Sequence, residues 1–134
     1  MKEKALILVV EDEVIIRMEA VQMLEDAGFA VVEASSALDA MEVLEQRSDV
    51  RAVFTDINMP GTWDGMKLAR MVRGRWPPIH LIVTSGRIFI NESNLPAGGR
   101  FIPKPYDPAY VIATISQLLN QSPFDPLISA RTAA

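Results

Sequence analysis

Runs of apolar and β-branched residues alternate along the chain with segments that carry apolar residues at helical spacing. Residues 5–10 form the first run, which has no polar interruption and stops at three acidic residues, as a strand buried on both faces of a sheet does. Similar runs follow at 29–34, 51–56, 79–84 and, in a shorter form, 101–102. Strands that alternate with helices predict a parallel sheet with helices on both faces.

The segments between these runs place apolar residues at every third or fourth position, which is the pattern of helices that pack on a sheet. The four stripes are Ile16, Ala20, Met23, Leu24 and Ala27; Ala37, Ala40, Met41 and Leu44; Leu68, Ala69 and Val72; and Val111, Ile115, Leu118 and Leu119. Segment 85–99 differs, because its asparagines, prolines and glycines leave room for only a short helix. With right-handed crossovers, we expect an α/β fold: a doubly wound five-stranded parallel sheet in the flavodoxin-like order 2-1-3-4-5, with a short or degenerate fourth helix.

Length, charge and composition narrow the possible functions. The 134 residues, of which 49% are hydrophobic and 22% charged, suit one globular domain, expected over residues 1–120 and followed by a loosely ordered tail, 121–134. A net charge of −4 does not favour nucleic acid, and Arg70, Arg73 and Arg75 are interpreted as the solvated face of a helix. The absence of cysteine excludes disulfides and thiolate chemistry. The apolar run at the start is too short for a signal peptide or a membrane span, which favours the cytoplasm.

Polar side chains follow four of the predicted strands at their carboxyl ends. Glu11 and Asp12 follow the first strand, Asp56 ends the third, Thr84 ends the fourth and Lys104 follows the fifth. In the expected strand order, the ends of strands one and three flank the point where the order reverses, and ligands bind there in sheets of this kind. We therefore expect three carboxylates, a hydroxyl and an ammonium group in one crevice.

Clustered carboxylates call for a cation. At ~4 Å, two of them repel by about 1 kcal/mol in water and by about 4 kcal/mol at an effective dielectric of ~20. Oxygen ligands without histidine or cysteine suit a hard cation, and we expect Mg²⁺. Asp12 and Asp56 are the expected direct ligands, the backbone carbonyl of Asn58 completes the shell, and the longer Glu11 acts through water.

The same site can handle a phosphoryl group. A carboxylate oxygen of Asp56 is a competent nucleophile towards phosphorus. The ammonium of Lys104 can pair with one phosphoryl oxygen as a point charge, and the hydroxyl of Thr84 can donate to another. Each residue alone has an ordinary structural interpretation, such as a turn, a helix start or a surface lysine, but all of these holding together is improbable.

In order and spacing, these residues resemble the receiver domain of two-component response regulators. The resemblance covers roughly residues 4–120 and rests on the acidic pair, Asp56 in D-I-N-M-P, Asp64-Gly65, Thr84-Ser85 and Lys104-Pro105. It implies Mg²⁺-dependent transfer to Asp56 from a histidine kinase or phosphotransfer protein. It also implies a cis peptide between Lys104 and Pro105, and a switch in which Thr84 and Phe101 move together.

Further expectations follow from the resemblance and from its limits. We expect a stand-alone receiver, because no output domain follows residue 119, and a monomer or weak dimer that signals to a downstream protein target. The chain departs from the family pattern in its Glu-Asp pair, in one extra residue between Asp56 and Asp64, and in a phenylalanine at the switch position. The stretch R-F-I-P-K-P-Y is similar to receivers that partner HWE-type sensor kinases.

Two other functions are compatible with parts of the pattern. A phosphatase of the haloacid-dehalogenase type also uses an aspartyl nucleophile, but it carries a second aspartate two residues on, where this chain has Asn58. A receiver that binds partners without being phosphorylated would not need Asp56, Thr84 and Lys104 intact. His80, the only histidine, lies within a predicted strand and is interpreted as structural.

Overall fold

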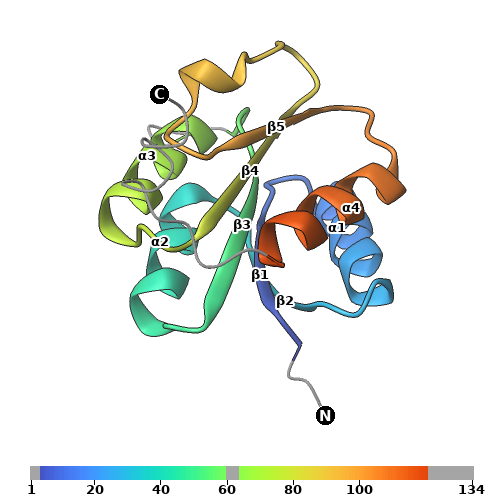
Figure 1. Ribbon diagram of the computed structural model, residues 1–134, viewed down its shortest axis with the longest axis horizontal. Helices are drawn as coiled ribbons and strands as arrows, with labels where there is room; N and C mark the ends of the chain where they lie inside the picture. The colour runs from blue at the N-terminus through green and yellow to red at the C-terminus, as the bar shows by residue number, and fades with distance from the viewer. Residues whose placement is uncertain (1–3, 60–63, 121–134) are drawn as a thin grey trace.

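The computed structural model describes residues 4–59 and 64–120, and its centre is a parallel sheet with helices on both faces (Figure 1). The strands are β1 (Leu6–Val10), β2 (Ala30–Ala34), β3 (Val50–Asp56), β4 (His80–Ser85) and β5 (Arg100–Pro103). The helices are α1 (Val14–Asp26), α2 (Ala37–Gln46), α3 (Gly65–Arg75) and α4 (Pro108–Leu119), and a 3₁₀ turn, η1, spans Glu92–Asn94. The sheet order β2-β1-β3-β4-β5 confirms the predicted fold class. The expected tail, 121–134, and residues 60–63 lie outside the described residues.

The sheet separates two apolar clusters. In Figure 1, α2 and α3 cover one face, and α1 and α4 cover the other. Neighbouring residues of one strand alternate between the clusters: Leu81 packs on the α2 and α3 side, and Ile82 on the α1 and α4 side. Every residue of β1 and β4 is buried, as continuous apolar runs predict for the middle of a parallel sheet. Within the described residues, no helix combines the length and apolarity needed to cross a bilayer.

Side-chain caps fix where α2, α3 and α4 begin. Ser36 accepts a hydrogen bond from the backbone N–H of Asp39 and so starts α2, and Asp64 accepts one from Lys67 and starts α3. Asp107 caps α4 in the same way, and a proline occupies the first position of that helix. Because each cap follows a strand or a short loop, the helices start close to the carboxyl edge of the sheet.

The segment between β4 and β5 forms only the 3₁₀ turn η1, which confirms the prediction of a short or degenerate helix there. Leu95 directly after η1 is buried with 7% of its surface exposed, and it packs in the cluster that contains Phe101. The segment from 86 to 99 is therefore held to the sheet by few side chains, in contrast to a full amphipathic helix.

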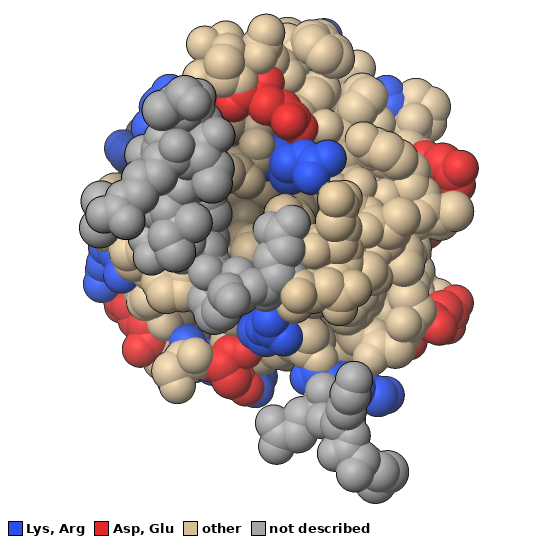
Figure 2. All heavy atoms as spheres, viewed as in Figure 1, with Lys and Arg blue, Asp and Glu red and all other residues tan. Residues whose placement is uncertain are grey.

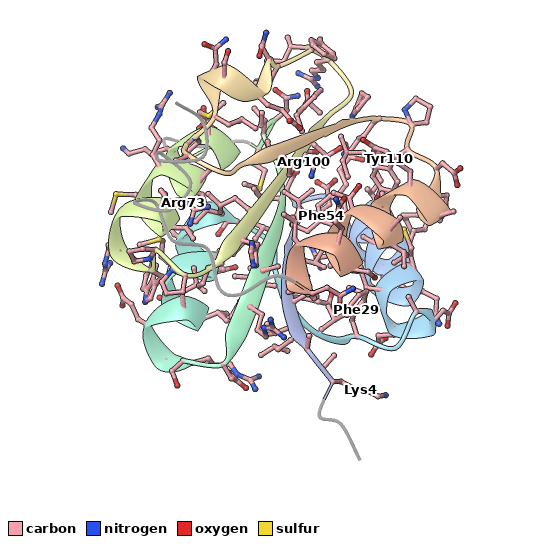
Figure 3. All side chains as sticks on the ribbon, in the orientation of Figure 1. Lys4, Phe29, Phe54, Arg73, Arg100 and Tyr110 are labelled. Atoms are coloured by element: carbon pink, nitrogen blue, oxygen red, sulfur yellow. The ribbon has the colours of Figure 1, made fainter. Side chains whose placement is uncertain are left out.

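Arg73 is not part of a solvated helix face, which corrects the interpretation of the arginine cluster. Its guanidinium, on α3 (Figure 3), donates to the backbone carbonyls of Ala97, Pro77 and Ile79 at 2.6–2.9 Å. Burial lowers the pKa of Arg73 to about 10. The side chain thus ties the segment before β5 to the end of α3, which a pattern of charged residues on a helix does not reveal.

Candidate functional site

Asp56 is the last residue of β3, and only 7% of its surface is exposed. Its Oδ1 accepts a hydrogen bond from the backbone N–H of Asn58 at 2.8 Å, and its Oδ2 lies 2.6 Å from Nζ of Lys104. Gly65 packs against the backbone of Asp56, where a Cβ at position 65 would overlap the Asp56 carbonyl oxygen. A buried carboxylate is therefore held by a donor on each oxygen, with the start of α3 drawn in against its backbone.

Lys104 follows β5 and bridges two carboxylates. Besides Asp56, its Nζ donates to Oε1 of Glu11 at 2.9 Å, and its backbone N–H donates to the carbonyl of Ser85 at 3.0 Å. The peptide bond between Lys104 and Pro105 is cis. Burial on its own would lower the pKa of Lys104, but the hydrogen bonds to Asp56 and Glu11 outweigh it and raise the pKa. The ammonium group is consequently charged at neutral pH and supplies the counter-charge of the site.

Glu11 directly follows β1 and is buried, with 4% of its surface exposed. Burial raises the pKa of Glu11, and the hydrogen bond and charge of Lys104 lower it. The charge of Asp56 and a hydrogen-bond interaction with Asp12 also raise it, so that the net shift is upward. Asp12 itself is only partly buried. Glu11 therefore gives up its charge more readily than an exposed glutamate does.

Thr84 lies beside Asp56, because the two residues are register partners on β4 and β3. The residue is buried, and its hydroxyl has no hydrogen-bond partner among the residues that the structure describes. A buried hydroxyl without a partner costs about 1–3 kcal/mol. Next to a carboxylate and an ammonium group, it is a donor available to a bound oxyanion.

Phe101, the predicted switch residue, lies on β5 one strand away from Thr84. It is buried with 6% of its surface exposed, and its backbone pairs with Val83 in the β4–β5 register. The ring of the exposed Phe89 meets the ring of Phe101 edge-on, with 5.4 Å between ring centroids. The structure thus places Phe101 between the strand that carries Thr84 and the segment before β5.

A second link between strand ends was not predicted from the sequence. The side-chain amide of Asn58 donates to Oγ of Ser85 at 2.8 Å, and the same oxygen accepts from the backbone N–H groups of Arg87 and Ile88 at 3.2 and 3.3 Å. Asn58 lies two residues after β3, and Ser85 ends the neighbouring strand β4. That adjacency was the available signal in the sequence. Ser85 thereby joins the loop that follows Asp56 to the segment that follows β4.

Comparison with known proteins decides the family. The response regulator receiver domain family matches residues 7–116. The chain belongs to this family. A response regulator receiver protein from Sinorhizobium medicae has a similar solved structure, with a TM-score of 0.82 and 34% identity over 88% of this chain and 96% of that one.

Curated relatives of this receiver domain are longer proteins. The chain is 35% identical over 123 residues to the sensor kinase CckA of Brucella abortus, which covers 87% of this chain and 13% of the relative. It is 31% identical to the transcriptional regulatory protein ResD of Bacillus subtilis, over 94% of this chain and 52% of the relative. The receiver domain therefore spans about half or less of the length of these relatives.

The chemistry of the donors at the receiver site fits a hard cation. Carboxylate oxygens of Asp12 and Asp56 and the carbonyl of Asn58 are the ligand types that Mg²⁺ takes, and Mg²⁺ needs only one or two protein carboxylates because it keeps several waters. No group of three or more histidine, cysteine, aspartate or glutamate side chains within the described residues is arranged to hold a metal. A site here would therefore depend on the backbone carbonyl and on water.

A cavity lies at the opposite edge of the receiver sheet, away from Asp56. It has a volume of about 670 Å³ and lies between the loop that precedes β3 and the loop that precedes β4. Two ion pairs, Arg47 with Asp49 and Arg75 with Glu45, neutralise charges on its rim. His80 lines this cavity, and burial followed by the charges of Arg73 and Arg51 lowers its pKa. The predicted site residues Glu11, Asp56, Thr84 and Lys104 lie at the other edge, so cavity size does not locate the candidate site.

Proposed function

We propose that this receiver domain accepts a phosphoryl group on Asp56 from the phosphohistidine of a sensor histidine kinase or a phosphotransfer protein. The observation that carries the proposal is a buried aspartate paired with Lys104 at 2.6 Å, beside the hydroxyl of Thr84, which has no partner among the described residues. Family membership supports it, because receiver domains are the phosphoacceptor modules of two-component systems. Partnership with an HWE-type kinase stays a prediction from the sequence.

The proposed transfer needs one nucleophile and groups that stabilise charge. An oxygen of Asp56 forms a bond to phosphorus while the phosphorus–nitrogen bond of the donor breaks, and the electron pair of that bond returns to the imidazole nitrogen. Lys104 is placed to follow the phosphoryl group, since its ammonium already contacts Oδ2 of Asp56. The hydroxyl of Thr84 can donate to a second phosphoryl oxygen.

We propose that Mg²⁺ binds beside Asp56 through Asp12, Asp56 and the backbone carbonyl of Asn58, with Glu11 acting through water. When bound, the ion neutralises negative charge on the phosphoryl group and on the carboxylates. Glu11 and Asp56 are held together by the ammonium group of Lys104, so a second cation would relieve the repulsion between them, which adds to burial in raising the pKa of Glu11.

The proposed output is a change of packing that another protein recognises. We propose that movement of Thr84 towards a phosphoryl oxygen vacates space beside β5 and that the ring of Phe101, whose register partner on β4 is Val83, moves in response. Such a switch is a shift between two packings, driven by the contact energy of the phosphoryl group. We expect the surface formed by β4, residues 85–99, β5 and α4 to change, and to act by protein–protein contact.

Phosphoryl labelling tests the proposal. The purified domain is incubated with acetyl phosphate and Mg²⁺, and intact mass is followed over time and after removal of the donor. We expect slow, reversible labelling of the wild type, no labelling after chelation of Mg²⁺, and none in Asp56→Asn, which keeps the shape of the side chain and loses the nucleophile. Undiminished labelling of Asp56→Asn would refute the assignment, and catalytic release of phosphate from the donor would favour a phosphatase.

A further inference from the structure

At its last residues the free edge of β5 presents one backbone donor, which belongs to the switch residue itself. Among the described strands, β5 is the last in the sheet order and pairs only with β4. The backbone N–H of Lys104 points to β4, where it donates to the carbonyl of Ser85. Backbone groups alternate in direction along a strand, so those of Phe101 and Pro103 point away from β4, to the free edge. Proline has no N–H, and the N–H of Phe101 is therefore the donor that this edge presents at these two positions.

The carboxylate of Glu92 is the acceptor for that donor. Its Oε2 accepts the hydrogen bond of the Phe101 N–H at 2.8 Å, and Nε of Arg100 lies 3.4 Å from the same oxygen. Figure 2 shows acidic and basic atoms side by side over η1 and β5, where this ion pair lies. The ion pair with Arg100 is half-exposed and weak on general grounds, so the short bond to the backbone is the specific contact.

Glu92 is itself held in place by its own turn. It is the first residue of η1, whose start is fixed by Asn91, since Oδ1 of Asn91 accepts from the N–H of Ser93 at 2.9 Å. The N–H of Leu95 then donates to the carbonyl of Glu92 at 3.1 Å, and Leu95 is buried in the cluster that contains Phe101. The carboxylate therefore reaches the backbone of β5 from a turn anchored in the core.

Segment 86–99 thus grips the switch residue at two separate points. Phe89 contacts the ring of Phe101 edge-on, and Glu92 binds its backbone N–H. Phe89 is 80% exposed and can turn away into solvent at small cost. The hydrogen bond that Glu92 accepts is directional and fixes the backbone of Phe101. It is therefore the contact that resists a shift of this residue.

We propose that Glu92 is a positioning residue for Phe101, and that its carboxylate favours the resting packing of the switch. This inference rests on the proposed function, because the switch has meaning only if Asp56 is phosphorylated. Breaking the bond shifts the balance towards the rearranged packing and releases η1 to follow β5. The charge of the carboxylate strengthens this hydrogen bond, and partial exposure to water weakens it. We therefore expect its loss to shift the equilibrium between the resting and the rearranged packing by about 5- to 10-fold.

Amide hydrogen exchange tests the contact itself. Exchange at the Phe101 amide is measured in the wild type, Glu92→Ala, Glu92→Gln and the matched control Ser93→Ala, with the Ile82 amide in the core as internal reference. We expect Glu92→Ala to speed exchange at Phe101 by about 5- to 10-fold, Glu92→Gln to restore most of the protection because its amide oxygen still accepts, and Ser93→Ala to leave it unchanged. Equal exchange in Glu92→Ala and wild type overturns the inference, as does equal loss of protection in Glu92→Gln and Glu92→Ala.

The rate of labelling by acetyl phosphate tests the effect on the switch. With the rearranged packing more populated, we expect Glu92→Ala to be labelled about 3- to 5-fold faster than the wild type, and Glu92→Gln close to the wild-type rate. A wild-type rate in Glu92→Ala overturns the positioning role. If the wild type is not labelled at all, the proposed function fails, while the exchange measurement still decides whether Glu92 holds Phe101.

Discussion

The carboxyl ends of β1 and β3 and the segment between β4 and β5 are built in opposite ways. At the strand ends, Glu11 and Asp56 are buried, stand on strands packed on both faces, and are joined by Lys104. The segment from 86 to 99 has one 3₁₀ turn, one buried leucine and a few hydrogen bonds to its neighbours. We propose that the first region holds the groups for phosphoryl transfer, and that the second, with few attachments to its neighbours, changes position. In the proposed function the two regions act together, and Ser85 links them through its hydrogen bonds with Asn58, Arg87 and Ile88.

Removing the ammonium group should damage the first region most. In Lys104→Gln, Glu11 and Asp56 remain buried and close together without their shared cation. Removing one partner from an ion pair that is mostly buried costs about 2–4 kcal/mol. Urea unfolding at neutral pH measures the loss, and labelling by acetyl phosphate should fall at least 100-fold. A variant that is as stable as the wild type would show that the bridge does not hold the site together.

The second region should depend on its single buried anchor. Leu95→Ala opens a cavity in the apolar cluster that contains Phe101 and should destabilise the domain by about 2–3 kcal/mol. Phe89→Ala is the matched control, because its side chain is 80% exposed and its removal should cost less than about 0.5 kcal/mol. Similar costs for the two variants, measured by urea unfolding, would mean that the segment is held along its length.

The charge of Glu11 should be visible in the pH dependence of stability. A carboxyl group whose pKa is raised on folding binds its proton more tightly in the folded state, so stability falls as pH rises from 4.5 through the folded pKa. Glu11→Gln removes this dependence, and its free energy of unfolding relative to wild type should therefore rise over that window. Parallel pH curves from urea unfolding would contradict the raised pKa.

The two regions also differ in how far the sequence predicts them. Continuous apolar runs and helical stripes predict the strands and helices, since burial on a sheet dictates both patterns, and parallel strand ends bring Glu11, Asp56, Thr84 and Lys104 to one edge. The contacts of Arg73 and Glu92 could not be predicted. Both are long charged side chains that bind backbone groups outside their own helix or turn, and the position of those groups depends on tertiary packing.

Hydrogen exchange with and without a phosphoryl mimic tests most directly whether the site and the segment are coupled. Beryllofluoride and Mg²⁺ are added to the wild type and to Asp56→Asn, and exchange is compared along the chain. We expect altered protection in the wild type both near residues 56–59 and across 84–104, with the largest change between 86 and 99, and no change in Asp56→Asn. Changes confined to the neighbourhood of Asp56, with 84–104 untouched, would contradict the coupling of the two regions.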